Sequence, residues 1–178
     1  MSRLTISPIA RAAGDTAELY AGLQRAIGKV PNLYATIGTH APLVLAQVLQ
    51  NGAALKRASL APREQEAINL AISEATGCDY CIAAHTLAAK RAGYSDAQAR
   101  ALRSGAYAED ARIDALIRFA LRLLRERGTL AAEHVEALRA AGYTDRQLVE
   151  IPQAVAAILF TNMVNRINDT TLDFPTPA

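Results

Sequence analysis

The chain has 178 residues, a net charge of +2 and only 5% aromatic residues. A chain of this length buries roughly 70% of its unfolded surface, so it can form one domain without disulfide staples. Because basic and acidic residues are interspersed along the sequence, we expect neither nucleic acid nor an anionic membrane surface as a partner.

The distribution of apolar residues bears on membrane association. The longest uninterrupted apolar run, from Ala154 to Phe160, is much shorter than the roughly 18 residues that a membrane span requires. The first residues lack the apolar centre of a secretory signal peptide. We therefore expect a cytoplasmic protein with no membrane partner. Thiols are kept reduced in that compartment, so a lone cysteine pair indicates catalysis or metal binding there.

The helix-forming composition predicts an all-α fold. Alanine is abundant, apolar residues recur every three or four positions, and runs of β-branched residues bounded by turns are absent. Pro62 suits a first helical position, and Gly77 suits a left-handed cap. The predicted helices cover residues 15–29, 42–55, 62–76, about 78–92, a short stretch from 96, 110–127, 131–140 and 144–168, the last with a bend at Pro152.

A short sequence recurs 49 residues further along the chain. Residues 92–98 read Ala-Gly-Tyr-Ser-Asp-Ala-Gln, and residues 141–147 read Ala-Gly-Tyr-Thr-Asp-Arg-Gln. Each copy predicts a helix end at glycine followed by a capping box. Reuse of favourable capping residues and an internal duplication both explain the pattern. The second copy has no cysteines, so a duplication would leave one active centre.

The segment around residues 78–85 concentrates the reactive side chains. It contains the only two cysteines, Cys78 and Cys81, and one of three histidines, His85. On a helix these three positions fall within an arc of about 60°. The cysteine pair at a helix start meets unpaired N–H groups, and His85 can accept a proton. Together with Glu66, twelve residues upstream, the group favours thiol redox chemistry.

Two other interpretations remain for the same residues. Buried cysteines are often simply small apolar core residues, so the pair can be structural. Cys78, Cys81, His85 and Glu66 are also four possible zinc ligands. Structural zinc sites generally add a second ligand pair at a defined spacing, which this sequence lacks. We therefore expect no bound metal and no cofactor.

The spacing of Glu66, Cys78, Cys81 and His85 resembles the signature of the alkyl hydroperoxidase D-like branch of the carboxymuconolactone decarboxylase superfamily. Residues 60–66, 92–94 and 160–169 are also similar to that branch. The resemblance implies one all-helical domain over residues 1–178, with a motif core at about 41–105. It implies an oligomer, either a trimer or a hexamer.

The resemblance also implies a thiol-dependent peroxidase. In that family the second cysteine attacks the hydroperoxide, so this role falls to Cys81. Cys78 then forms a disulfide with it, while Glu66 and His85 relay the proton. An external dithiol, of lipoyl type in that family, reduces the disulfide. Helix-terminus arguments alone would instead nominate Cys78 as the more acidic thiol.

Several residues and two alternative functions are left open by the sequence. Tyr80 stands where the family has a further relay histidine, and a phenol is a poor base near neutral pH, so packing is its expected role. We expect His40 in a loop and His134 in solvent. Asn162 and Asn165 need buried partners or a subunit contact. A non-enzymatic redox sensor and a zinc-binding oligomer are the alternatives to the peroxidase.

Overall fold

The computed structural model describes residues 2–127 and 130–177, and across these residues the chain is helical without strands. A short 3₁₀ helix at Ile9–Arg11 precedes the α-helices. These are α1 (Gly14–Ile27), α2 (Asn32–His40), α3 (Pro42–Lys56), α4 (Pro62–Ala75), α5 (Asp79–Arg91), α6 (Asp96–Arg103), α7 (Ala111–Arg125), α8 (Ala132–Ala140) and α9 (Asp145–Asn168). The predicted all-α fold class is confirmed.

Helix α2 is the helix that the sequence did not predict. It ends at His40, which was expected in a loop. Its glycine at position 38 disfavours a helix, because glycine loses the most backbone freedom. The same glycine lets the Tyr20 ring of α1 approach closely, and the Tyr20 hydroxyl donates a hydrogen bond to the Ala35 carbonyl at 3.1 Å. Packing against α1 therefore outweighs the local propensity.

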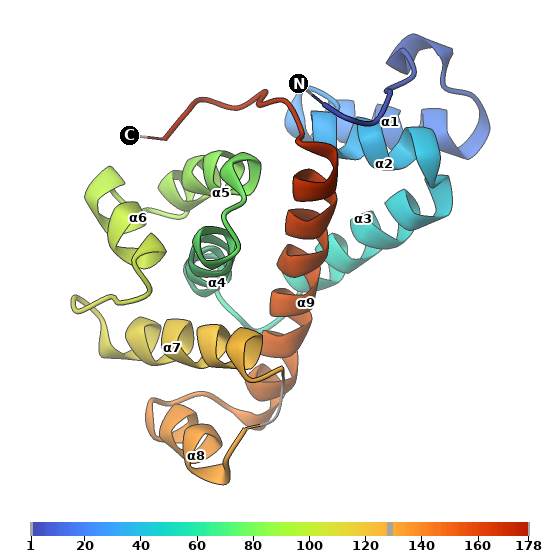
Figure 1. Cartoon of the computed structure of the whole chain (residues 1–178). Coiled ribbons are helices and arrows are strands. Elements are labelled where there is room, and N and C mark those ends of the chain that lie inside the picture. The colour runs from blue at the N-terminus through green and yellow to red at the C-terminus, as the bar shows by residue number, and fades with distance from the viewer. Residues whose placement is uncertain (1, 128–129, 178) are drawn as a thin grey trace.

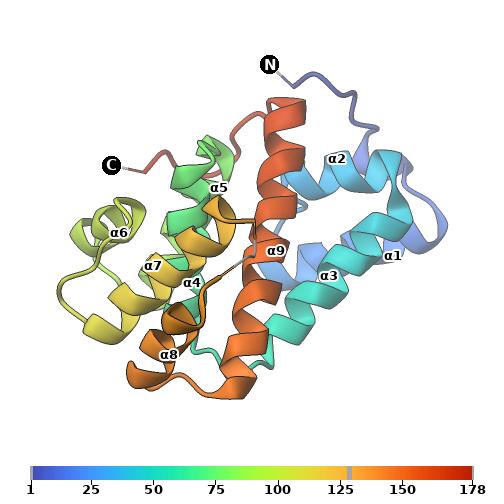
Figure 2. The same ribbon diagram turned by 60° about the horizontal axis from the view of Figure 1, so that its bottom comes forward.

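Helix α9 runs through the middle of the molecule. Helices α1–α3 lie on one side of it, and α4–α7 lie on the other (Figures 1 and 2). Its buried face combines aliphatic side chains with three asparagines, which are Asn162, Asn165 and Asn168. Helix α4 packs against α5, α6, α7 and α9, so it forms the centre of the second group. The element that carries the cysteines, α5, is thereby held between α4 and α9.

Helix α9 is also long and apolar enough, by its length and composition, to cross a membrane. The uninterrupted apolar run within it is short, but an 18-residue window reaches a mean hydropathy of 1.3, and a third of that window is buried. Central helices of soluble proteins pass the same test. In this structure α9 packs against α2 and α3 and against α4, α5 and α7.

The two similar segments noted in the sequence adopt the same local structure. Arg63 stacks on the Tyr94 ring at 3.9 Å and donates to the Gly93 carbonyl at 3.0 Å. In the same way, Arg112 stacks on Tyr143 at 4.0 Å and donates to the Gly142 carbonyl at 2.7 Å. The two arginines are 49 residues apart in the sequence, and so are the two tyrosines. We call these two contacts the arginine–tyrosine clamps, and they favour duplication over chance reuse of caps.

Candidate functional site

The cysteine pair lies at the turn from α4 into α5. Gly77 adopts a left-handed backbone conformation with φ of 64°, as the sequence predicts, and reverses the chain after α4. Cys78 is the N-cap residue of α5, and its Sγ accepts a hydrogen bond from the Cys81 backbone N–H at 3.3 Å. The sulfurs are therefore at the positive end of a 13-residue helix.

Cys78 and Cys81 form a disulfide, with their Cα atoms 5.3 Å apart. The pair is almost fully buried, since the two residues are 2% and 3% exposed. Asn165 of α9 donates a hydrogen bond from its side-chain amide to Cys81 Sγ at 3.2 Å. Each sulfur thus receives one N–H donor, from the helix start for Cys78 and from α9 for Cys81.

The two residues predicted to relay the proton, His85 and Glu66, contact each other across two helices. His85 Nδ1 lies 2.8 Å from Glu66 Oε2, and the side chains are 25% and 17% exposed. Asn69, one turn after Glu66 on α4, donates to the other carboxylate oxygen at 3.3 Å. A carboxylate at Nδ1 leaves Nε2 as the nitrogen that can accept a proton. Asn69 was not predicted, although its i+3 spacing from Glu66 is visible in the sequence.

The structure therefore brings the four predicted site residues into two adjacent groups. Cys78 and Cys81 are bonded to each other, and Glu66 is bonded to His85. Across residues 2–127 and 130–177, no hydrogen bond joins the imidazole to either sulfur. Any proton transfer between the two groups then requires a water molecule or a small movement of one side chain.

Tyr80, between the two cysteines, is held by the C-terminal tail. Its hydroxyl donates to Asp173 Oδ1 at 2.7 Å and accepts from the Leu33 backbone N–H at 3.3 Å. Its ring contacts Phe174 edge-on, with centroids 5.5 Å apart. Burial, followed by the bond to Asp173, raises the pKa of the phenol well above its ordinary value. These contacts agree with the predicted packing role and leave Tyr80 no part as a base.

Asp173 is the centre of this tail contact. Its carboxylate lies 3.0 Å from Lys29 Nζ and also accepts from the Asn32 backbone N–H at 3.2 Å. Lys29 additionally contacts the Asp173 carbonyl and the Phe174 ring. The tail after α9 is consequently tied to the α1–α2 turn and to the cysteine segment (Figure 1). The sequence contained no signal for this contact.

In the described residues, His40, His134 and Asn162 make no hydrogen bond to either sulfur of the disulfide. His40 Nε2 is 2.8 Å from the Thr5 carbonyl oxygen, and the His134 side chain, 25% exposed, lies 3.9 Å from Glu133. Asn162 is fully buried, donates to Thr76 Oγ1 at 2.8 Å and accepts from Ser73. Asn162 therefore finds a partner for each end of its amide within the chain, whereas Asn165 uses only its amide nitrogen, which donates to Cys81 Sγ. Both residues are too deeply buried for a subunit contact.

A cavity of about 620 Å³ opens on the Cys78 side of the disulfide. Arg3 and Arg166 contribute positive charge to its wall, and Asp79 contributes negative charge. The Arg166 guanidinium donates to the Gly77 carbonyl at 2.5 Å, which fixes that wall against the cysteine turn. Tyr80 and Asn165 complete the lining close to Cys78. Of the two cysteines, Cys78 lines this cavity and Cys81 does not.

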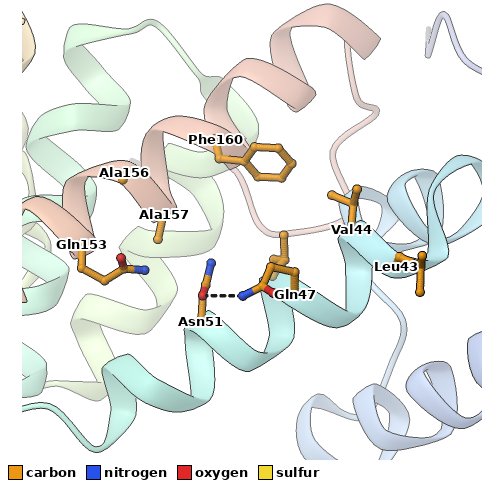
Figure 3. A pocket seen from close by; sticks show the side chains of 9 residues that line it. Leu43, Val44, Gln47, Asn51, Gln153, Ala156, Ala157 and Phe160 are labelled. Atoms are coloured by element: carbon orange, nitrogen blue, oxygen red, sulfur yellow. Dashed lines mark hydrogen bonds between the residues drawn. The ribbon is translucent and has the colours of Figure 1, made fainter.

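A second hollow, of about 410 Å³, lies between α3 and α9 (Figure 3). Its wall is largely apolar, with Leu43 and Val44 on α3 and Phe160 on α9. Gln47 donates to Asn51 at 3.0 Å along one side. None of the residues that line this hollow lines the cavity at Cys78. It is therefore a separate surface feature.

The candidate zinc ligands do not form a metal site in the described residues. In the described ranges 2–127 and 130–177, no three histidine, cysteine, aspartate or glutamate side chains are grouped as a metal site. Both predicted thiolate ligands are joined to each other in the disulfide. The four residues that the zinc alternative invokes are thus arranged as a redox pair beside a carboxylate–histidine pair.

Comparison with known proteins gives a fold for the chain and a family match for part of it. Residues 42–126 match the carboxymuconolactone decarboxylase family. A peroxidase-related protein from Ralstonia eutropha JMP134, with an alkylhydroperoxidase AhpD core, is similar in structure with a TM-score of 0.87. It shares 23% identity over 97% of this chain and 92% of its own. No curated protein matches the sequence.

Two further solved structures share the fold. A peroxidase-related protein from Silicibacter sp. TM1040 has a TM-score of 0.81 and 22% identity, over 96% of this chain and 91% of its own. The debrominase Bmp8, solved with 2,3,4-tribromopyrrole, has a TM-score of 0.78 and 22% identity, over 97% and 94%. The chain has the alkyl hydroperoxidase D-like fold, and over residues 42–126 it is similar to the carboxymuconolactone decarboxylase family. It carries the redox-type cysteine pair within the matched segment.

Proposed function

We propose that the protein is a thiol-dependent peroxidase that reduces hydrogen peroxide or organic hydroperoxides. The observation that carries this proposal is the Cys78–Cys81 disulfide at a helix start, next to the His85–Glu66 pair. A pair that closes a disulfide within one turn of chain can store and release two electrons. The neighbouring imidazole supplies the base that thiol activation requires.

The oxidative half-reaction uses the two cysteines in sequence. His85 takes the proton of Cys81 through a water molecule, and the thiolate attacks one peroxide oxygen, so that an S–O bond forms while the O–O bond breaks. The departing alkoxide takes up a proton and leaves as an alcohol, or as water from hydrogen peroxide. The Cys78 thiol then attacks the sulfenic sulfur and displaces hydroxide, which takes the Cys78 proton to form water.

An external dithiol completes the proposed cycle. One of its thiolates attacks the protein disulfide and forms a mixed disulfide, and its second thiol displaces the protein sulfur. The dithiol becomes a cyclic disulfide, and both cysteines are regenerated. A lipoyl-type dithiol suits this chemistry because its two thiols are linked. We place the cycle in the cytoplasm, where such reductants are kept in the dithiol form.

The protein is further proposed to act as a homo-oligomer, a trimer or a hexamer. An apolar stripe on the outside of α9 supports this, since Ala156, Phe160, Met163 and Ile167 follow spacings of three and four residues, and Val149 lies seven residues before Ala156. Val149, Met163 and Ile167 are 73%, 49% and 65% exposed. Sedimentation of the purified protein at micromolar concentration tests this, and a monomer at all concentrations would contradict it.

The debrominase with the same fold indicates that this scaffold can serve another substrate in another protein. The peroxide itself must therefore be tested. Reduced, metal-free protein is mixed with hydrogen peroxide or cumene hydroperoxide at pH 7, and the remaining thiols are counted over time. We expect two thiols to be lost per chain, no loss in Cys81→Ala, and a trapped sulfenic acid in Cys78→Ala. Thiols that react no faster than free cysteine would refute the peroxidase.

The two alternatives predict different outcomes. A redox sensor would oxidise once and stop, even with a dithiol present, whereas an enzyme would turn over. A zinc protein would contain about one metal ion per chain as isolated, and its thiols would be protected from alkylation. Metal analysis and a turnover assay on the same preparation distinguish the three functions.

A further inference from the structure

Asn165 is the polar side chain of α9 that reaches a reacting atom. Its amide nitrogen lies 3.2 Å from Cys81 Sγ, and the residue is only 3% exposed. A thiolate accepts hydrogen bonds far more strongly than a thiol does, because a charged acceptor roughly doubles the strength of the bond. An N–H donor at this distance therefore favours the ionised form of Cys81 over the protonated form.

The other half of the Asn165 amide indicates that the residue is not there for stability alone. Its Oδ1 is buried and has no hydrogen-bond partner in the described part of the chain. An unsatisfied buried acceptor lowers the stability of the fold. Asn162, one turn earlier, uses both ends of its amide in contacts with α4 and the residue that follows it. Asn165 thus makes fewer hydrogen bonds with its side-chain amide than Asn162 does.

We propose that Asn165 is a catalytic hydrogen-bond donor that holds Cys81 as a thiolate, an inference that rests on the proposed thiol cycle. It acts at two points of that cycle. Before the peroxide step it lowers the free energy of the attacking thiolate relative to the thiol. During disulfide reduction it stabilises the same sulfur as it leaves.

The second role follows from where the cavity meets the disulfide. Cys78 lines the cavity and Cys81 does not, so an incoming dithiol reaches Cys78 first. A bond forms between the dithiol sulfur and Cys78 Sγ, the disulfide breaks, and the electron pair passes to Cys81 Sγ. The leaving sulfur is then the one to which Asn165 donates. A better stabilised thiolate is a better leaving group.

The chain offers a matched control for this proposal. Asn162 and Asn165 have the same side chain, lie on the same helix and are both buried, but no hydrogen bond of Asn162 involves a sulfur. Replacing either with alanine removes the same volume from the same helix. A general packing defect would affect both variants, whereas loss of a thiolate donor would affect Asn165→Ala alone.

The experiment measures the ionisation of Cys81 as the only thiol. In a Cys78→Ala background, the rate of iodoacetamide alkylation is followed from pH 5 to 10. We expect Asn165→Ala to raise the apparent thiol pKa by at least one unit, and to slow alkylation about tenfold or more below that pKa. Asn165→Asp, which keeps the shape but replaces the donor with a carboxylate, should raise it further. Asn162→Ala should leave the profile unchanged.

The outcomes separate this inference from the peroxidase itself. An upward shift in both Asn165 variants, without one in Asn162→Ala, supports the inference whether or not the protein consumes peroxide. Equal shifts at positions 162 and 165, or no shift at 165, overturn it even if peroxide turnover is found. If Asn165→Ala does not fold, the isosteric Asn165→Asp decides by the same criterion. Dithiothreitol reduction of the full disulfide should be slower by a similar factor in Asn165→Ala.

Discussion

The two halves of the repeat share a frame and differ in chemistry. The first half is residues 62–103, and the second half is the corresponding segment 49 positions later. In each half a glycine ends a helix, the next residue is the tyrosine of the arginine–tyrosine clamp, and a capping box then begins another helix. The pairing of a basic residue with the aspartate that begins the next helix also recurs, as Lys90–Asp96 and Arg139–Asp145. The shared contacts therefore lie at the ends of the helices, and the residues between those ends differ between the two halves.

The reactive residues have only one counterpart in the second half. His85 corresponds to His134, but Cys81 corresponds to Leu130 and Glu66 to Ala115. His85 consequently has a carboxylate on the facing helix at 2.8 Å, while His134 has only its neighbour Glu133 at 3.9 Å. The proposed relay role therefore falls to His85, which has both a carboxylate and a thiol nearby, and not to His134. The comparison assigns the proposed activity to the first half alone.

The largest predicted effect tests that assignment directly. His85→Asn should lower the rate of peroxide-dependent thiol loss by about 10²-fold or more, because the general base is removed. His134→Asn, the matched change in the second half, should leave the rate unchanged. Stopped-flow peroxide kinetics on both variants provide the measurement. Equal effects of the two changes would break the distinction between the halves.

The clamps themselves should differ in stability. Arg112→Ala removes the Gly142 and Tyr143 contacts and also leaves the buried Glu64 carboxylate without its ion pair at 3.0 Å. We expect a loss of about 2–3 kcal/mol in the free energy of unfolding. Arg63→Ala removes only the clamp contacts and should cost about 1 kcal/mol. Urea unfolding of both variants tests the ranking, and a larger loss for Arg63→Ala would contradict it.

A smaller effect is expected from Tyr80, which the second half lacks. Tyr80→Phe removes the bonds to Asp173 and to the Leu33 N–H and should cost about 1 kcal/mol. The peroxide rate should stay within about twofold of wild type, because the phenol contacts the tail rather than a sulfur. Unfolding and kinetics are measured on the same sample. A rate loss like that of His85→Asn would show that Tyr80 belongs to the relay.

The smallest effect concerns Glu150 of α9, whose carboxylate accepts hydrogen bonds from Ser59, just before α4. Burial alone would raise its pKa, but hydrogen bonds from Ser59 and Arg146 together hold the pKa below its usual value. A carboxyl whose pKa is lowered by folding stabilises the protein above its unfolded pKa of about 4.3, and this contribution is lost as the pH falls through the folded pKa. Glu150→Gln should therefore be less stable than wild type at pH 7, with the difference shrinking below about pH 4. A constant difference across this range would contradict the argument.

Most helices could be predicted because their ends are marked locally. Gly77 has the left-handed conformation that its position indicated, and the capping boxes at Ser95 and Thr144 are present. Helix α2 was missed because it depends on contact with Tyr20 rather than on its own composition. A single sequence contains no local signal for such packing.

The residues of the candidate site also divide into those with a local sequence signal and those placed only by tertiary packing. Cys78, Cys81 and His85 share one short segment, and Glu66 could be added by its resemblance to a known spacing. Asn165 and Asp173 could not be assigned, because their contacts with Cys81 and Tyr80 join residues 84 and 93 positions apart. Asn165 was noticeable as a polar residue on an apolar helix face. Its partner became known only when α9 was placed against α5.

Steady-state peroxide consumption with a dithiol reductant is the most direct test of the proposed peroxidase activity. Wild-type protein at about 1 µM is incubated with excess dihydrolipoamide and hydrogen peroxide or cumene hydroperoxide, and consumption is corrected for the reaction without protein. If the protein is a thiol-dependent peroxidase, we expect each chain to consume many peroxide molecules, and we expect Cys81→Ala to abolish this turnover. Consumption that stops after one equivalent per chain, or that persists in Cys81→Ala, would contradict it.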